Sequence, residues 1–258
     1  MTNFLYCILF FFTLFHVPFF SLFSTENKKD SLPEEILFGI PAKVDQSISR
    51  QGFSLGYSYK YRQAVWVSYT LTEEKVKNDI VKRRPSFRID PAIKFAPVRP
   101  KDYTGTGYDK GHLAPAADMA WSVLSMKNSF YMSNISPQIP GCNRGIWKRV
   151  EKTVRQWAVK EKKLCIITGP VFHNTNKLLP NTAIPIPTAF YKVVLDMTPP
   201  MKMIGFLIPN AASKKRVFAF AVPVDKVEEV TKYDFFSALD DEIENKIEKE
   251  CNILQWTN

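Results

Sequence analysis

Hydrophobic and polar positions along the chain follow two different periods, and each period predicts a different kind of element. The second half of residues 52–71 alternates and is rich in aromatic and β-branched side chains, which predicts one or two strands. Residues 143–163 repeat apolar positions every three or four residues, which predicts the clearest helix. Further strands are predicted at residues 130–138, 164–172, 190–197, 202–210 and 217–224, and further helices at residues 117–130 and within 225–247.

This order of elements predicts a single α+β (mixed α/β) domain over residues 51–258. Residues 25–50 are polar and mixed, which predicts a linker. Residues 1–24 contain no charged side chain and are almost entirely apolar, which indicates a signal peptide or a membrane anchor. We therefore expect export from the cytoplasm, to a secreted, periplasmic or membrane-anchored location, with residues 4–23 as the attachment segment if they are not cleaved.

The net charge of the chain indicates which class of partner it binds. The net charge is +10, and all of it lies after the apolar segment, so polyanions are the expected partners: nucleic acid first, an anionic membrane second. A basic protein that charge merely keeps soluble is the alternative. The four cysteines include no C-x-x-C pair, which excludes a zinc knuckle.

One histidine lies in a setting that favours chemistry. The stretch "YDKGHLAPAADM", residues 108–119, places His112 in a polar, glycine-rich segment, and histidine is the side chain best suited to accept a proton near neutral pH. His173 follows the apolar strand end "GPVF", which favours a structural role.

The start of the predicted helix 143–163 carries a second polar group. Glu151 and Arg155 are one turn apart and share a face, which also fits an ordinary surface ion pair. Asn143 fits a helix N-cap. Its amide oxygen equally suits a Mg²⁺ ion that keeps most of its waters, with a carboxylate further along the helix to hold those waters.

Three motifs occur in one order along the chain: "DKGH" (109–112), "NISPQ" (134–138) and "NRGIWKRVEKTVR" (143–155). With them the chain resembles the DNA/RNA non-specific endonuclease family over roughly residues 50 to 230. The resemblance implies a ββα-metal (His-Me finger) nuclease fold, with a central, mostly antiparallel sheet flanked by helices. It also implies Mg²⁺-dependent hydrolysis of DNA and RNA to 5′-phosphate ends, with Mn²⁺ as an alternative metal and a homodimer as a frequent assembly.

The resemblance implies a role for each matching residue. His112 would be the general base that takes a proton from the attacking water. Asn143 would bind the metal directly and Glu151 would hold it through water. Asn134 would assist close to His112 and the phosphate, and Asp109 would orient the motif.

The remaining matches concern the phosphate. Arg155 and an arginine of the segment "KRRPSF" (82–87), first of all Arg84, would hold it and offset charge in the transition state. Lys110 stands where the family usually has arginine, so it keeps the charge but loses the bidentate geometry. This departure leaves open a catalytically weak, basic nucleic-acid-binding protein. The residues are also compatible with a membrane-tethered surface protein or with a phosphodiesterase for smaller substrates.

Overall fold

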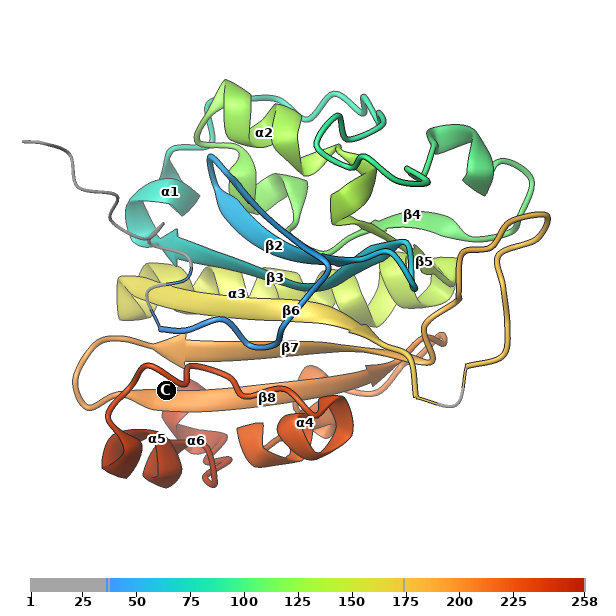
Figure 1. The fold of residues 1–258 in the computed structure, drawn as a ribbon. Coiled ribbons are helices and arrows are strands. Elements are labelled where there is room, and N and C mark those ends of the chain that lie inside the picture. Colours follow the sequence, from blue (N-terminus) through green and yellow to red (C-terminus); the bar gives the residue numbers. More distant parts are fainter. Residues whose placement is uncertain (1–35, 37, 174, 258) are drawn as a thin grey trace, which may run out of the picture. The chain divides into compact units, whose positions relative to one another are not determined.

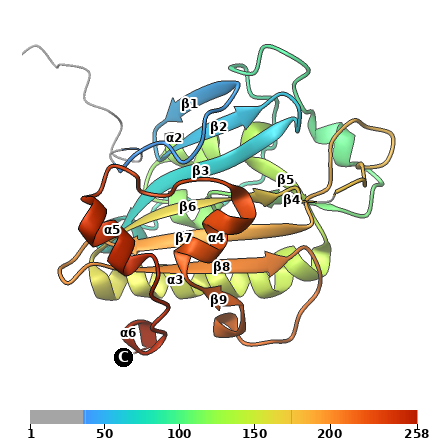
Figure 2. The same cartoon turned by 60° about the horizontal axis from the view of Figure 1, so that its bottom comes forward.

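A seven-stranded sheet runs through the computed structural model, in the order β1-β2-β3-β6-β7-β8-β9, and every neighbouring pair is antiparallel (Figures 1 and 2). The structure describes residues 36, 38–173 and 175–257, which belong to the unit Leu32–Asn258. The strands of this sheet are β1 Gln46–Arg50, β2 Phe53–Ser58, β3 Gln63–Thr72, β6 Lys163–Val171, β7 Ala189–Asp196, β8 Lys202–Pro209 and β9 Ala221–Val222.

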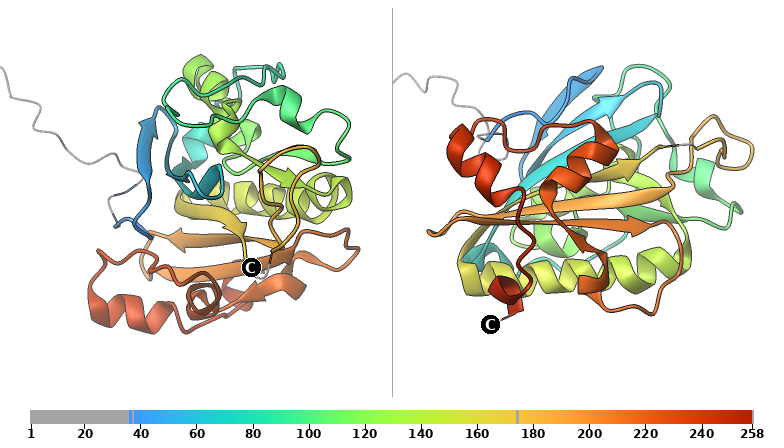
Figure 3. Two further views of the ribbon diagram at one scale, coloured as in Figure 1. Left: turned by 45° about the vertical axis from the view of Figure 1, so that its right-hand side comes forward. Right: turned by 90° about the horizontal axis from the view of Figure 1, so that it is seen from below.

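Both faces of the sheet are covered, so the central strands are buried on both sides. On β7, Phe190 and Val194 belong to one hydrophobic core, whereas Tyr191 and Val193 belong to the other. Helix α3 covers the first face, and α4 and α5 cover the second (Figures 2 and 3). The helices are α1 Glu73–Lys77, α2 Val123–Ser129, α3 Lys148–Glu161, α4 Val224–Thr231, α5 Asp241–Ile247 and α6 Leu254–Thr257.

Helix α3 forms where the three- and four-residue spacing predicts it. Its buried side chains are Val150, Val154, Trp157 and Ala158, which lie on one stripe and pack against the sheet. The side chains between them therefore remain free to serve a site on another face of the helix.

A two-stranded antiparallel hairpin lies beside this helix and is separate from the large sheet. It pairs β4, Asp109–His112, with β5, Ile135–Gln138, and places His112 opposite Ile135. Gly111 is required here, because a Cβ at this position would overlap the Gln138 side chain. An irregular helical turn, Cys142–Trp147, then leads into α3, so that two strands and a helix form the ββα unit.

Several sequence predictions give longer elements than the structure contains. Within the predicted strand at 130–138, a 3₁₀ turn, Met132–Asn134, precedes β5. The predicted strand at 217–224 is a 3₁₀ turn, Val217–Phe220, followed by the two-residue edge strand β9. Pro223 comes next and has no N–H to extend the pairing. The predicted helix at 117–130 is divided into a 3₁₀ turn, Ala116–Met119, and α2, because the Ser122 hydroxyl caps a new helix start.

The start of the domain is also earlier than predicted. The expected linker over residues 25–50 includes β1, whose five residues pair with β2 along their whole length. The apolar segment 1–24 lies outside the described residues, so the signal or anchor stays a prediction. Within the described part of the chain, none of the helices combines the length and apolarity that a bilayer crossing needs.

Candidate active site

The ββα unit surrounds a cavity of about 500 Å³ that gathers most of the predicted site residues. Its polar lining comes from the loop after α1, from β4, from the turn Cys142–Trp147 and from α3. The residues lining it are Arg83, Lys110, His112, Pro115, Ala116, Ala117, Asn143, Arg144, Lys148, Glu151 and Arg155. The imidazole of His112 and the amide of Asn143 therefore reach one cavity from two different elements.

His112 is held as a neutral base. Its ring lies between Phe87 and Phe130, with ring centroids 5.5 and 5.0 Å away, and Nε2 is buried with no hydrogen-bond partner among the described residues. Burial, assisted by the positive charge of Arg83, lowers the pKa of His112 to about 3. The imidazole is consequently uncharged near neutral pH, and so low a pKa also makes it a weaker base than a free imidazole.

Asn134 holds the segment that follows His112 and is itself fully buried. Its Oδ1 accepts a hydrogen bond from the Ala114 N–H at 2.9 Å, and its Nδ2 donates to the carbonyls of Ala114 and Ser129, each at 2.9 Å. The structure corrects the expectation that Asn134 assists beside the phosphate, because backbone groups already occupy both ends of its amide. Asn134 positions the backbone behind the histidine.

Asp109 joins the hairpin to the turn before α3. Its carboxylate accepts a hydrogen bond from Asn143 Nδ2 at 2.8 Å and two from Arg144, at 2.8 and 2.6 Å. Burial works against its charged form, but the bonds from Arg144 and Asn143 outweigh it and lower the pKa of Asp109. Asn143 is thus no helix N-cap: Asp109 fixes its amide nitrogen and leaves Oδ1 without a hydrogen bond among the described residues.

Glu151 and Arg155 both line the cavity, but they are not an ion pair. Arg155 Nη1 donates to Asp118 Oδ1 at 2.6 Å, and Tyr69 Oη donates to Asp118 Oδ2 at 3.0 Å. The Asp118 side chain is 1% exposed, so this anion is anchored inside the protein. Arg155 uses one of its five N–H donors there, which leaves the others for the cavity.

Glu151 is half-buried as a residue, and its carboxyl forms no hydrogen bond with any described residue. Burial raises the pKa of Glu151, and Lys192 opposes that rise more than any other charged neighbour. Lys192 is fully buried on β7, and burial lowers the pKa of its amine while Glu151 raises it. Glu151 therefore lies between the open cavity and a buried cation.

Of the two neighbouring arginines in the loop after α1, Arg83 and not Arg84 faces the cavity. Both side chains are exposed, but Arg83 lines the cavity, with its guanidinium 5.6 Å from the Phe130 ring centroid, whereas Arg84 does not line it. The structure therefore moves the expected phosphate contact by one residue, from Arg84 to Arg83. Lys110 lines the same cavity, with its amine 5.6 Å from the Phe87 ring and 5.7 Å from the Tyr103 ring.

The donor set suits a hard cation that keeps most of its waters. Asn143 offers a neutral amide oxygen, and Glu151 offers a carboxylate further along the helix. The described residues contain one group of three close acidic ligands, at Asp225, Glu228 and Glu248, with ligand atoms within 4.8 Å of one another. That group lies on the α4 and α5 side of the sheet, away from His112.

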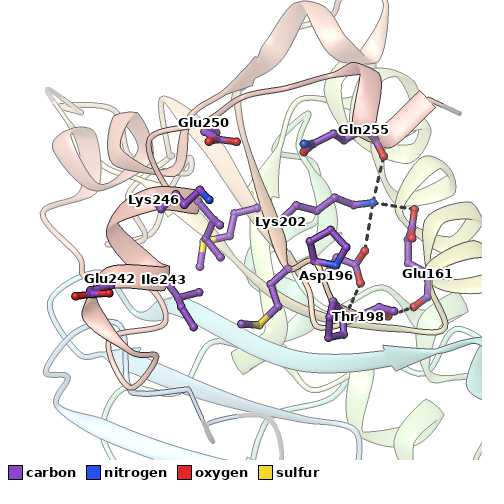
Figure 4. Close-up of a pocket in the computed structure, with 14 residues that line it drawn as sticks. Glu161, Asp196, Thr198, Lys202, Glu242, Ile243, Lys246, Glu250 and Gln255 are labelled. Carbon is purple, nitrogen blue, oxygen red and sulfur yellow. Dashed lines mark hydrogen bonds and ion pairs between the residues drawn. The ribbon is translucent and has the colours of Figure 1, made fainter.

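A larger cavity, of about 820 Å³, lies between the β7–β8 turn and α5, and it does not suit nucleic acid (Figure 4). Its central cation, Lys202, is bound by Glu161 at 3.1 Å and by Asp196 at 3.3 Å. The acidic side chains of Glu242 and Glu250 also line it, and they would repel phosphate.

Three residues that shape the site are not predicted from the sequence: Asp118, Tyr69 and Lys192. Asp118 lies near the end of the stretch "YDKGHLAPAADM", but its burial and its two partners are visible only in three dimensions. Lys192 lies inside the apolar segment "FYKVV", where one polar residue is typical of an exposed strand position.

Comparisons with known proteins point to one family. The model of the DNA/RNA non-specific endonuclease family matches residues 35–242. Nuclease C1 of Cunninghamella echinulata var. echinulata is 34% identical over 227 residues, which cover 80% of this chain and 89% of that protein. Mitochondrial endonuclease G of Homo sapiens is 29% identical over 206 residues, which cover 74% of this chain and 69% of that protein.

A solved structure has the same fold. The crystal structure of the EndoG/EndoGI complex superposes with a TM-score of 0.74 at 28% identity, over 80% of this chain and 91% of that chain. Together with the large antiparallel sheet and the ββα unit, this likeness confirms the predicted ββα-metal nuclease fold.

Proposed function

Because this chain belongs to the DNA/RNA non-specific endonuclease family and is an endonuclease, we propose that the cavity of its ββα unit is where phosphodiester bonds are hydrolysed. The substrates are DNA and RNA, the metal is a single Mg²⁺ or Mn²⁺, and His112 is the general base. The observation that carries this proposal is the convergence of His112 and Asn143 on one cavity from β4 and from the turn before α3.

The neutral state of His112 supports its role as base. A water that attacks phosphorus must lose a proton, and an uncharged imidazole can take it. Attack on one side of the phosphorus breaks the P–O3′ bond on the other side, which leaves 5′-phosphate and 3′-hydroxyl ends. Bound phosphate would also offset the positive charge of Arg83, which in the free protein helps to lower the His112 pKa.

The orientation of Asn143 supports its role as the direct metal ligand. Asp109 accepts a hydrogen bond from Asn143 Nδ2, so Oδ1 is the atom left to bind a cation, and Glu151 would hold the waters of that cation. A bound Mg²⁺ or Mn²⁺ would stabilise the charge that develops on the phosphoryl and leaving oxygens. A neutral amide also suits this role because it does not repel the anionic substrate.

Positive side chains around the cavity support phosphate binding. Arg83, Lys110 and Arg155 line it, and Asp118 holds Arg155 in place at 2.6 Å. Contacts of this kind neutralise the backbone of any nucleic acid and read no sequence. Cleavage at subsaturating substrate should therefore weaken steeply as salt concentration rises.

Digestion of supercoiled plasmid by the purified full-length chain tests the proposal. We expect cleavage with Mg²⁺, loss of cleavage with EDTA, recovery when Mg²⁺ is restored, and 5′-phosphate ends on the products. The His112→Ala variant should bind DNA and fail to cut it. Equal cleavage by that variant and the wild type would refute the base assignment. Comparison with RNA and with a dinucleotide separates a polynucleotide nuclease from a phosphodiesterase for small substrates.

Export is the location that we propose, on the basis of the charge-free apolar segment at residues 4–23. Deletion of residues 1–24 should leave the nuclease in the cytoplasm of the expressing cell, whereas the full chain should be recovered at the membrane or outside. A truncated chain that still leaves the cytoplasm would contradict this proposal. We propose a homodimer as the assembly, and sedimentation of the purified chain tests it.

A further inference from the structure

A lysine without a hydrogen-bond partner among the described residues lies at the back of the active site. Lys192 is at the middle of β7, opposite Thr168 on β6 and Phe206 on β8, and its side chain is fully buried. Phe190 and Val194, two residues before and after it, belong to the core beneath α3. The lysine side chain accordingly extends toward α3 and the ββα unit.

Contacts with aromatic rings locate its ammonium group. Nζ is 5.0 Å from the ring centroid of Trp147 and 5.6 Å from that of Tyr69. Trp147 immediately precedes α3, and Glu151 lies one turn further along the same face. Tyr69 binds Asp118, which in turn holds Arg155 one turn beyond Glu151. The ammonium is thus bracketed by groups on both sides of Glu151.

Burial of an ammonium group at this position costs free energy, because the group loses its hydration. Its three donors have no hydrogen-bond acceptor among the described residues, and two aromatic faces offset the lost hydration only in part. A methionine would fill similar space at this position without any desolvation of charge. Stability alone therefore does not explain a lysine there.

Asp118 and Arg155, two charged residues near Lys192, are paired with each other, and Glu151 has no direct partner among the described residues. Asp118 holds Arg155 by a hydrogen bond at 2.6 Å, and this arginine forms no ion pair with the neighbouring Glu151 carboxylate. No hydrogen bond or ion pair from a described residue holds Glu151. Of the cations near this carboxylate, Lys192 behind it acts most strongly, ahead of Arg155 and Arg83, and the cavity lies in front of it.

We propose that Lys192 is a positioning residue, whose buried charge holds the Glu151 carboxylate at the wall of the cavity where it can bind the waters of the metal. This inference rests on the proposed function, because it gives Glu151 the task described above. Lys192 acts through Glu151 and does not touch substrate. It belongs to the shell of residues that orient those holding a metal, and loss of such a residue costs about 10- to 100-fold in metal affinity or activity.

The variant Lys192→Met tests the inference, with Lys192→Gln measured beside it. We expect the Mg²⁺ concentration for half-maximal cleavage to rise about 10-fold or more. The KM for DNA should change little, and the melting temperature without metal should also change little, because the desolvation cost of the buried ammonium disappears together with its attraction to Glu151. A lysine that only supports the fold would give the opposite pattern: a lower melting temperature and an unchanged Mg²⁺ requirement.

A matched control comes from the neighbouring strand. Phe206 is paired with Lys192 on β8 and belongs to the same core. Phe206→Leu should lower the melting temperature and leave the Mg²⁺ requirement unchanged. If it shifted the Mg²⁺ requirement as much as Lys192→Met, general loosening of the core would explain the result and the inference would be overturned.

A double-mutant cycle separates the inference from the function on which it rests. In the Glu151→Gln background, Lys192→Met should add little to the loss, because the group through which it acts is already gone. Independent, multiplying losses would overturn the positioning role. Wild-type chain that needs no divalent cation would instead refute the proposed function, whatever the lysine variants show.

Discussion

Removal of the Asp109 carboxylate should weaken metal use far more than it weakens the fold. In Asp109→Ala the Asn143 amide loses the acceptor 2.8 Å from its nitrogen, so its oxygen is no longer directed into the cavity. A hydrogen bond to a charged group contributes about 1.5–3 kcal/mol, which corresponds to about a 10- to 150-fold rise in the Mg²⁺ concentration for half-maximal cleavage. The ion pair lost at the same time involves Arg144, whose side chain is 73% exposed, and should contribute at most about 1 kcal/mol to stability.

The variant Arg144→Ala is the control for this prediction. It removes the same ion pair but leaves the bond from Asn143 to Asp109 in place. Initial cleavage rates across a Mg²⁺ series, with melting temperatures measured in parallel, compare the two variants. Because Arg144 also lines the cavity, its loss should raise the KM for DNA rather than the Mg²⁺ requirement. Equal Mg²⁺ requirements in the two variants would refute the claim that Asp109 acts through Asn143.

Three further predictions concern other contacts of the site. The His112 pKa is about 3, against 6.5 for a free histidine, so as pH falls the unfolded chain takes up this proton before the folded chain does. The free energy of unfolding should therefore decline between about pH 6.5 and pH 3, and His112→Gln should reduce that decline in denaturant titrations. Arg155→Ala should lower the free energy of unfolding by about 3–5 kcal/mol by leaving Asp118 charged and unpaired, and adding Asp118→Asn should recover part of it in the same measurement. Arg83→Ala should reduce kcat/KM at least about 10-fold, as expected when a charged contact to phosphate is lost, whereas Arg84→Ala should match the wild type in the same assay.

The order of the motifs along the chain indicated where the centre of the site lies, because its main residues belong to short, continuous segments. His112 lies on a short strand, and Asn143 and Glu151 flank the start of a helix whose apolar stripe is legible in the sequence. The roles of His112, Asn143 and Glu151 came from the resemblance of the three motifs to a known family, whereas periodicity alone predicts the helix. The same is true of β6, β7 and β8, which lie where apolar segments predict them.

Burial and loop geometry account for what the sequence did not reveal. Asn134 has the composition of a polar site residue, yet it is enclosed and bonded to backbone. Arg83 and Arg84 are neighbours in an irregular loop, so no periodicity decides which one faces the cavity. Lys192 looks like an exposed strand position until α3 is packed over that face of the sheet.

Binding of metal and cutting of DNA, measured on the same three proteins, test the central claim most directly. Mn²⁺ binding by electron paramagnetic resonance and plasmid cleavage would be compared for the wild type, His112→Ala and Asn143→Ala. We predict that His112→Ala binds Mn²⁺ as the wild type does but does not cut, and that Asn143→Ala does neither. Cleavage by His112→Ala, or Mn²⁺ binding of wild-type strength by Asn143→Ala, would contradict the division of roles between the base and the metal ligand.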